Sequence, residues 1–198
     1  MKIVFVDAEF TGLHAATTLV SMGLVTFEGA PLYVSFNDYN RPQVTEWLQD
    51  NVLNLIDERM SVSTPEGFRR IADFLEGYAQ GDPITLVSAG KAFDLILLFE
   101  LWGARCPSGT AFHWHQWVPG YLCHRAHLDL DTLFVACGID PDVDRDVYVG
   151  HAVSGTRHHA LYDAQVVREC FLKLLREGLL PSGLRAKVLG DAVSAYAG

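Results

Sequence analysis

The order in which strand-like and helix-like patterns follow one another constrains the fold of this chain most strongly. Buried-strand patterns come first, at residues 3–6, 17–27 and 32–36, with turn residues at 28–31. Closely spaced strands of this kind are typical of an antiparallel meander. Strand and helix patterns then alternate to the end of the chain. This order predicts an α/β domain built around a mixed sheet.

The later patterns predict the remaining elements. A capping pattern, Ser63-Thr64-Pro65-Glu66, begins an amphipathic helix. We expect helical segments at residues 42–56, 63–78, 93–102, 129–136, 159–176 and after Pro181, and strands at residues 84–87 and 145–149. Residues 106–123 are rich in Trp and His but lack periodicity, which predicts a long surface loop. Without a repeat or a low-complexity linker, residues 1–198 are expected to form a single domain.

Hydropathy and cysteine usage favour a cytoplasmic protein. The longest apolar runs, such as residues 95–99, are much shorter than the ~20 residues that span a bilayer. The cysteines lie in unrelated contexts without a CxxC pair, which favours reduced thiols. They are Cys106, Cys123, Cys137 and Cys170. We therefore expect a cytoplasmic location and no membrane-spanning segment.

The charge of the chain limits its nucleic-acid partners. Fifteen Lys and Arg residues against 24 Asp and Glu residues give a net charge of −9. A broad, sequence-independent grip on duplex phosphates requires Lys and Arg to displace counterions, so long-duplex binding is disfavoured. The same charge suits an enzyme that holds divalent cations and takes short or single-stranded ends, because bound metal reverses the local field.

Two carboxylates, Asp7 and Glu9, end the first predicted strand. Alternation along a strand points both side chains to the same face, roughly 7 Å apart. Hard cations such as Mg²⁺ or Mn²⁺ prefer oxygen ligands, and two ions ~4 Å apart can stabilise the attacking and leaving oxygens of phosphoryl displacement. Taken alone, however, this pair is weak evidence, and a solvated strand end is the favoured interpretation.

Three motifs in order strengthen the interpretation as a metal site. Asp7-Ala8-Glu9-Phe10-Thr11-Gly12-Leu13 resembles the first motif, DxExTGL, of the DEDDh 3′-to-5′ exonucleases. Ala92-Phe93-Asp94 resembles the second motif, and His158-His159-Ala160-Leu161-Tyr162-Asp163-Ala164 resembles the third, HxAxxDA. The resemblance runs from Met1 to about Leu175 and is greatest to small bacterial exoribonucleases of the ribonuclease T and oligoribonuclease kind. It implies a ribonuclease H-like fold, with a mixed central sheet of about five strands flanked by helices.

The resemblance also implies a role for each motif residue. Asp7, Glu9, Asp94 and Asp163 would hold two divalent cations, Mg²⁺ or Mn²⁺. His158 would be the general base that takes a proton from the attacking water. The expected substrate-binding residues are Phe10, Gly12, Leu13, Phe93 and Arg157. Phe93 would stack on a base, and Arg157, together with Lys91, would meet phosphate. Larger members usually carry a His or Asn before the second motif, where this chain has Ser88-Ala89-Gly90-Lys91.

The expected substrate is the 3′ end of short or single-stranded RNA, from which 5′-nucleoside monophosphates would be released. The small relatives favour RNA, whereas single-stranded DNA is the alternative because no motif visibly reads the 2′-OH. Two other functions stay open: a catalytically silent nucleic-acid-binding module, and hydrolysis of another phosphodiester such as a small nucleotide. Relatives of this size are often dimers, so we expect a homodimer.

Two further patterns compete with these assignments. The spacing HxxxxD occurs twice, and the pair His158 and Asp163 is preferred over His124 and Asp129 because it begins the last long helix. Asp129 and Asp131 are interpreted as helix caps. The His- and Cys-containing residues 113–127 match no familiar zinc spacing. An aromatic loop beside the substrate or at a dimer interface is favoured there.

Overall fold

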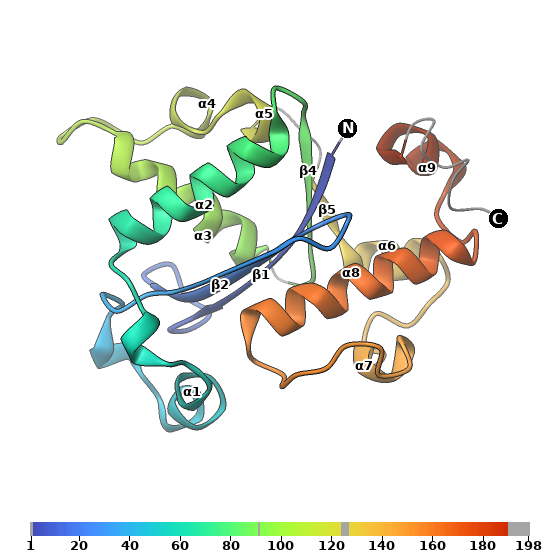
Figure 1. The fold of residues 1–198 in the computed structure, drawn as a ribbon, viewed down its shortest axis with the longest axis horizontal. Coiled ribbons are helices and arrows are strands. Elements are labelled where there is room, and N and C mark those ends of the chain that lie inside the picture. Colours follow the sequence, from blue (N-terminus) through green and yellow to red (C-terminus); the bar gives the residue numbers. More distant parts are fainter. Residues whose placement is uncertain (1, 91, 124–126, 190–198) are drawn as a thin grey trace.

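Five strands form one mixed sheet in the spatial order β3-β2-β1-β4-β5 (Figure 1). The computed structural model describes residues 2–90, 92–123 and 127–189. The strands are β1 (Lys2–Phe10), β2 (Leu19–Thr26), β3 (Pro31–Ser35), β4 (Ile84–Ser88) and β5 (Leu128–Asp129). The first three pair antiparallel, whereas β4 lies parallel to β1 and β5 parallel to β4. The expected meander and mixed sheet are confirmed.

Helices cover both faces of this sheet (Figure 1). The helices of the described residues are α1 (Glu46–Asn51), α2 (Thr64–Ala79), α3 (Phe93–Glu100), α4 (Trp114–Trp117), α5 (Gly120–Cys123), α6 (Leu130–Ala136), α7 (Arg145–Tyr148), α8 (Ala160–Arg176) and α9 (Ser182–Leu189). Short 3₁₀ turns lie at Arg41–Gln43, Leu53–Leu55, Glu58–Met60 and Leu101–Arg105. Within the described ranges, no helix combines the length and the apolar character that crossing a bilayer requires.

Alternation along β1 divides the core into two layers. Val4 and Val6 face a cluster formed with α2 and α3, whereas Ile3 and Phe5 face a cluster formed with α6 and α8. Both faces of β1 are therefore buried, which explains its nearly continuous run of apolar residues up to Asp7. Because the strand is fixed from both sides, the carboxylates at its end have a rigid support.

The predicted start of α2 is correct, but its cap comes from elsewhere in the chain. Ser63 makes no side-chain cap hydrogen bond. Instead, the Asp38 carboxylate accepts hydrogen bonds from the Thr64 backbone N–H and from Thr64 Oγ1, both at 2.8 Å. A carboxylate satisfies an otherwise unpaired N–H at a helix start and also faces the positive end of the helix dipole. The local sequence located the helix, whereas a distant loop supplied the cap.

One expectation about the later elements is wrong. The sequence predicts a strand at residues 145–149, but Arg145–Tyr148 is the helix α7, and the Asp144 side chain accepts a hydrogen bond from the Val147 N–H at its start. Val147 is exposed, so its alternation with Val149 does not reflect burial in a sheet. The fifth strand is β5, whose two residues are too few to give a periodic signal.

The segment at residues 106–123 is only partly the surface loop that its sequence predicts. Its second half contains α4 and α5, and Val118 and Leu122 are buried in the core beside α2 and α3. Aromatic residues obscured this pattern, because Trp and His fit helix, loop and interior positions alike.

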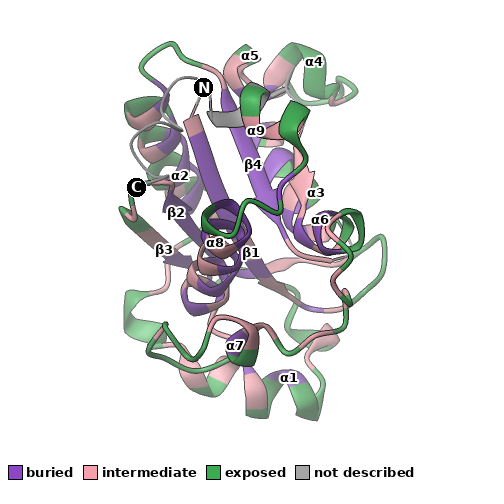
Figure 2. Cartoon of the chain, turned by 90° about the vertical axis from the view of Figure 1, so that its right-hand side faces the viewer, coloured by how far each residue is buried: buried purple, intermediate pink, exposed green. Residues whose placement is uncertain are grey.

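One end of the molecule gathers the segments that carry the motifs. β1 runs towards the end of the molecule where α1 and α7 lie, and α8 packs against the sheet above α7 in this view (Figure 2). The first turns of α3 and α8 carry Asp94 and Asp163.

Candidate active site

The first two carboxylates lie on β1 beyond its pairing with β4. The described pairing of β1 with β4 extends to Phe5 opposite Val87, whereas Asp7 and Glu9 continue against β2 opposite Gly23 and Ser21. Beyond its pairing with β4, β1 is hydrogen-bonded to α3 instead. The Ala8 N–H donates to Asp94 Oδ1 at 3.1 Å. This hydrogen bond places the second-motif carboxylate beside the first two.

Asp94 begins α3 after an unusual backbone turn. Ala92 precedes the helix with a φ of 63°, in the left-handed region that residues other than glycine rarely adopt. Asp94 itself is buried. Its carboxylate therefore depends on the Ala8 N–H and on any cation at the site for compensation of its charge.

The third motif reaches the same place because α8 packs closely on β2. A Cβ atom at Gly23 would lie 2.3 Å from the Ala160 carbonyl oxygen, so only glycine allows the start of the helix to approach the sheet this far. Asp163 Oδ2 accepts a hydrogen bond of 2.7 Å from the His158 N–H. His158 has a φ of 65°, and this hydrogen bond helps to hold its left-handed backbone.

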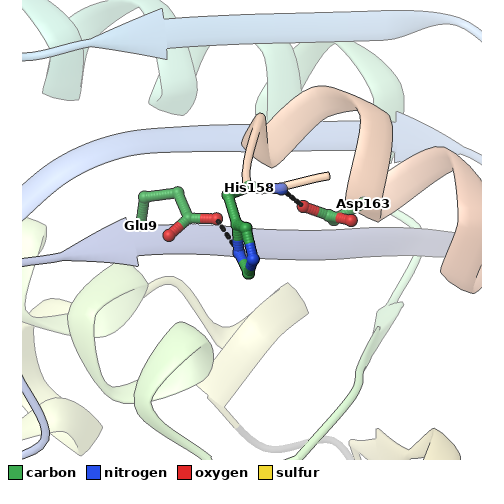
Figure 3. A group of neighbouring side chains, drawn as sticks. All are labelled: Glu9, His158 and Asp163. Carbon is green, nitrogen blue, oxygen red and sulfur yellow. Dashed lines mark hydrogen bonds and ion pairs between the residues drawn. The ribbon is translucent and has the colours of Figure 1, made fainter. Parts of the chain in front are cut away.

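The His158 ring lies beside Glu9 (Figure 3). His158 Nδ1 is 3.9 Å from Glu9 Oε1, and 43% of the His158 side chain is exposed. One potential ligand atom from each of Glu9, His158 and Asp163 lies within 4.8 Å of the others. Among the residues that the structure describes, this is the one group of three His, Cys, Asp or Glu side chains with such spacing.

Burial and mutual repulsion perturb all four carboxylates. Burial, followed by repulsion from Asp163 and Asp94, raises the pKa of Glu9 to about 8. Burial likewise raises the pKa of Asp94 to about 7 and that of Asp163 to about 6. The pKa of Asp7 rises well above its ordinary value, first through burial and then through its three acidic neighbours. Bound cations would favour the fully ionised form of this cluster at neutral pH, because an opposite charge lowers the pKa of a carboxyl group.

Nearby arginines act in the opposite direction. Arg145 lowers the pKa values of Asp7, Asp94 and Asp163, although burial outweighs it in each case. The pKa of His158 is lowered by burial and then by Arg157, so its ring is neutral and can accept a proton at pH 7.

The donor set, four carboxylates from three elements, fits hard divalent cations such as Mg²⁺ or Mn²⁺.

Two adjoining cavities open at this cluster. The first, of about 510 Å³, is lined by the first motif, by Phe93 and Asp94, and by Trp47 and Leu48 of α1. The second, of about 460 Å³, is lined by residues 142–146, Arg157, His158 and Asp163. Asp7, Glu9, Ala89 and Arg145 line both cavities. The carboxylates therefore lie where a mainly apolar cavity meets a polar one.

The predicted site residues that the structure describes all line these cavities. Phe10, Gly12, Leu13 and Phe93 line the first, and Arg157 lines the second. The Phe10 and Phe93 rings stack with centroids 5.2 Å apart, so their faces are partly used by each other. Arg157 is engaged as well: its Nε donates to Asp146 at 2.6 Å, and its Nη2 donates to Asp144.

Sequence reasoning missed two residues that line the first cavity. Trp47 is 55% exposed, and its ring meets the His158 ring edge-on at a centroid distance of 5.0 Å. Thr45 caps α1, and Leu48 of the same helix is buried in a cluster with Val20 and Val52, whereas Trp47 stays exposed at the cavity. Arg145 was hidden in the wrongly predicted strand. No sequence pattern marked Trp47, because only the structure shows that its side chain is exposed at the cavity.

Asp129, from the second HxxxxD pair, and His127, from the His- and Cys-containing segment, both have structural roles. Asp129 caps α6 by accepting from the Thr132 N–H at 2.9 Å, and it also accepts from the Gly90 N–H at 2.9 Å. His127 Nδ1 accepts from the Leu86 N–H at 3.2 Å, so this ring is part of the interior beside β4. Lys91, His124 and the side chain of Cys123 lie outside the described residues.

The fold and the comparisons define the same structural class. The mixed five-stranded sheet with helices on both faces is a ribonuclease H-like fold, and two solved structures share it. The chain is similar to the structure of Pop2p from S. pombe in its Mg²⁺- and Mn²⁺-bound form, with a TM-score of 0.60 and 14% identity over 87% of this chain and 82% of that one. It is also similar to a full-length 3′-exonuclease, with a TM-score of 0.65 and 12% identity over 90% and 83% of the two chains. No protein-family model and no curated protein sequence matches the chain.

Proposed function

We propose that this protein is a 3′-to-5′ exoribonuclease that hydrolyses phosphodiesters with two divalent cations. The observation that carries the proposal is the convergence of Asp7, Glu9, Asp94 and Asp163 from three elements, with the His158 ring beside Glu9. A binding module has no use for four repelling carboxylates, because the burial of such charges is costly unless a cation compensates them. The same carboxylates are oxygen ligands of the type that Mg²⁺ and Mn²⁺ prefer.

The chain's own residues divide the chemistry among them. The four carboxylates would hold two divalent cations, which would supply charge stabilisation for the attacking and leaving oxygens. His158 accepts the proton of the attacking water, since its pKa is lowered and its ring is partly exposed at the cluster. Asp163 orients His158 through the backbone N–H and fixes the turn from which the ring projects.

The first cavity is suited to the terminal nucleoside. Its volume of about 510 Å³ lies in the range of small-molecule sites, and its walls are largely apolar. Leu13 and Trp47, which are 58% and 55% exposed, offer surfaces on which a base can pack. Phe10, Gly12 and Phe93 complete the wall, and Arg157 contributes positive charge to the polar cavity next to it. Such a cavity suits the 3′ end of a nucleic-acid strand rather than a continuous duplex.

RNA is the proposed substrate over DNA because of the sequence resemblance to small exoribonucleases and the net charge of −9. The fold resembles that of proteins solved as a 3′-exonuclease and as Mg²⁺- and Mn²⁺-bound Pop2p, and this likeness supports metal-dependent cleavage in general. The homodimer, the single domain and the cytoplasmic location stay predictions. Size-exclusion chromatography with light scattering measures the first of these directly.

Degradation of 5′-labelled single-stranded RNA and DNA of matched sequence tests the proposal. We expect one-nucleotide shortening from the 3′ end with Mg²⁺ or Mn²⁺ and none with EDTA. A 3′-phosphate should block the reaction, and Asp7→Ala and His158→Ala should abolish or strongly reduce it. Arg59→Gln, which changes an exposed arginine paired with Asp57, should leave the rate unchanged. Cleavage that persists without metal would contradict the mechanism. Binding of RNA without shortening would favour the silent module, and faster DNA shortening would replace RNA as the substrate.

A further inference from the structure

Arg145 lies at the junction of the two cavities, where the substrate's phosphate would be held. It lines both cavities together with Asp7, Glu9 and Ala89. Its positive charge acts on Asp7, Asp94 and Asp163, three of the four carboxylates from the motifs. A terminal nucleoside in the apolar cavity would direct its 5′ side towards the polar one. The phosphate on that side would then lie next to Arg145.

Arg145 has hydrogen-bonding capacity that its protein contacts leave unused. Its Nη2 donates to Asp131 Oδ1, whereas its buried Nε has no hydrogen-bond partner. A third of the Arg145 side chain is exposed, at 33%. By contrast, both the Nε and the Nη2 of Arg157 are bonded to carboxylates. Of the two arginines that line the cavities, Arg145 is therefore better able to donate new hydrogen bonds to a phosphate.

The helix that carries Arg145 is anchored on several sides. Asp146 accepts hydrogen bonds of 2.6 Å from both Tyr162 Oη and Arg157 Nε. Lys173 Nζ donates to the Tyr148 carbonyl at 2.7 Å at the other end of α7. Asp131 then orients the guanidinium from α6. A guanidinium that is held in place before the ligand arrives loses little entropy when it binds two phosphate oxygens.

We propose that Arg145 binds the 5′-phosphate of the terminal nucleotide, and later the same phosphate in the nucleoside monophosphate product. This inference rests on the proposed function for the identity of the substrate. Four carboxylates and two divalent cations leave no surplus positive charge for an anionic phosphate, and Arg145 supplies that charge. It is a substrate-binding residue, and Asp131 is the residue that positions it.

Calorimetric binding of AMP and adenosine in Mg²⁺ tests the proposal without turnover. The native protein should prefer AMP to adenosine, and Arg145→Met should reduce this preference about tenfold or more, because hydrogen bonds to charged groups are among the stronger ones. Adenosine affinity should stay the same. Arg145→Lys should keep part of the preference, because it keeps the charge but loses the two-pronged geometry. Arg59→Met, a surface control, should not alter the preference.

Asp131→Asn separates phosphate binding from a purely structural role. If Arg145 only held α6 and α7 together, Asp131→Asn and Arg145→Met would have equal effects on thermal stability and on the AMP preference. We expect instead that Asp131→Asn keeps most of the preference. If Arg145→Met does not fold, Arg145→Lys provides the same comparison. An unchanged preference in the folded Arg145 variants, or no preference in the native protein, overturns the inference.

The outcomes also separate this inference from the proposed function. If the native protein shortens RNA but its preference for AMP does not depend on Arg145, the inference about Arg145 is refuted and the proposed function stands. Native protein that does not shorten RNA, but binds AMP in an Arg145-dependent manner, refutes the exonuclease and retains the phosphate site.

Discussion

The repulsion within the carboxylate cluster predicts that the metal-free protein is less stable at pH 8 than at pH 5. Burial and the neighbouring aspartates raise the pKa of Glu9 from its ordinary value of 4.5 to about 8. A carboxyl group whose pKa is raised by folding favours the folded state while it is protonated. This stabilisation is lost as the pH rises from the unfolded-state pKa to the folded-state pKa. The affected window therefore lies between about pH 4.5 and pH 8.

The magnitude follows from the two pKa values of Glu9. One pKa unit corresponds to about 1.36 kcal/mol, so ionising this group in the folded protein costs about 4 kcal/mol at pH 8 and about 1 kcal/mol at pH 5. Glu9→Gln removes the charge at nearly constant size. In EDTA, this variant should raise the free energy of unfolding by up to about 3 kcal/mol more at pH 8 than at pH 5. For a chain of this length, that difference corresponds to roughly 6 to 12 °C in Tm.

Thermal denaturation followed by circular dichroism in EDTA, at pH 5 and pH 8, measures this effect. Glu58→Gln, an exposed glutamate on a surface 3₁₀ turn, is the matched control and should show no pH-dependent gain. Adding Mg²⁺ at pH 8 should stabilise the native protein more than Glu9→Gln, because the variant has lost a ligand. Equal Tm values for native protein and Glu9→Gln at both pH values would refute the reasoning about the cluster.

Four further substitutions test packing, anchoring and substrate contact. Gly23→Ala should push the start of α8 away from β2 and cost about 1–3 kcal/mol, measured by denaturant unfolding. Gly77→Ala, where an added Cβ meets nothing within 4 Å, should instead stabilise α2 by about 0.5–1 kcal/mol. Tyr162→Phe leaves the buried Asp146 without one donor and should cost about 1–3 kcal/mol in the same assay, and an unchanged midpoint would contradict the anchoring of α7. Trp47→Ala should raise KM for short RNA by roughly 5- to 150-fold with little change in kcat, as expected for the loss of about 1–3 kcal/mol of base stacking. A fall in kcat alone would instead assign Trp47 to the support of the neighbouring histidine.

Much of the fold could be predicted because its signals are local. The apolar run of β1, the meander and the positions of α2 and α8 follow from periodicity and capping, which depend on residues a few positions apart. The order of the motifs also located Asp7, Glu9, Asp94, Asp163 and His158 before any contact was known. Each of these residues lies in the last part of β1 or near the start of a helix.

Only the tertiary structure decided how these elements complement one another. Whether residues 145–149 form a strand or a helix depends on Asp144, Asp146 and their distant partners, because a short apolar alternation is compatible with both. The two-residue β5 exists only because β4 pairs with it.

The electrostatic environment of the site was likewise set by residues far apart in the sequence. The sequence alone assigned Arg157 to phosphate, but the folded chain engages Arg157 with two carboxylates and brings Arg145 to the cavities. Charges interact over distances in space, and no local pattern records which arginine will lie beside which carboxylate. The sequence by itself thus predicted the proposed ligand set and most of the elements that carry it. Tertiary packing determined the neighbours of those ligands, because only packing brings distant charges and rings within a few ångströms of one another.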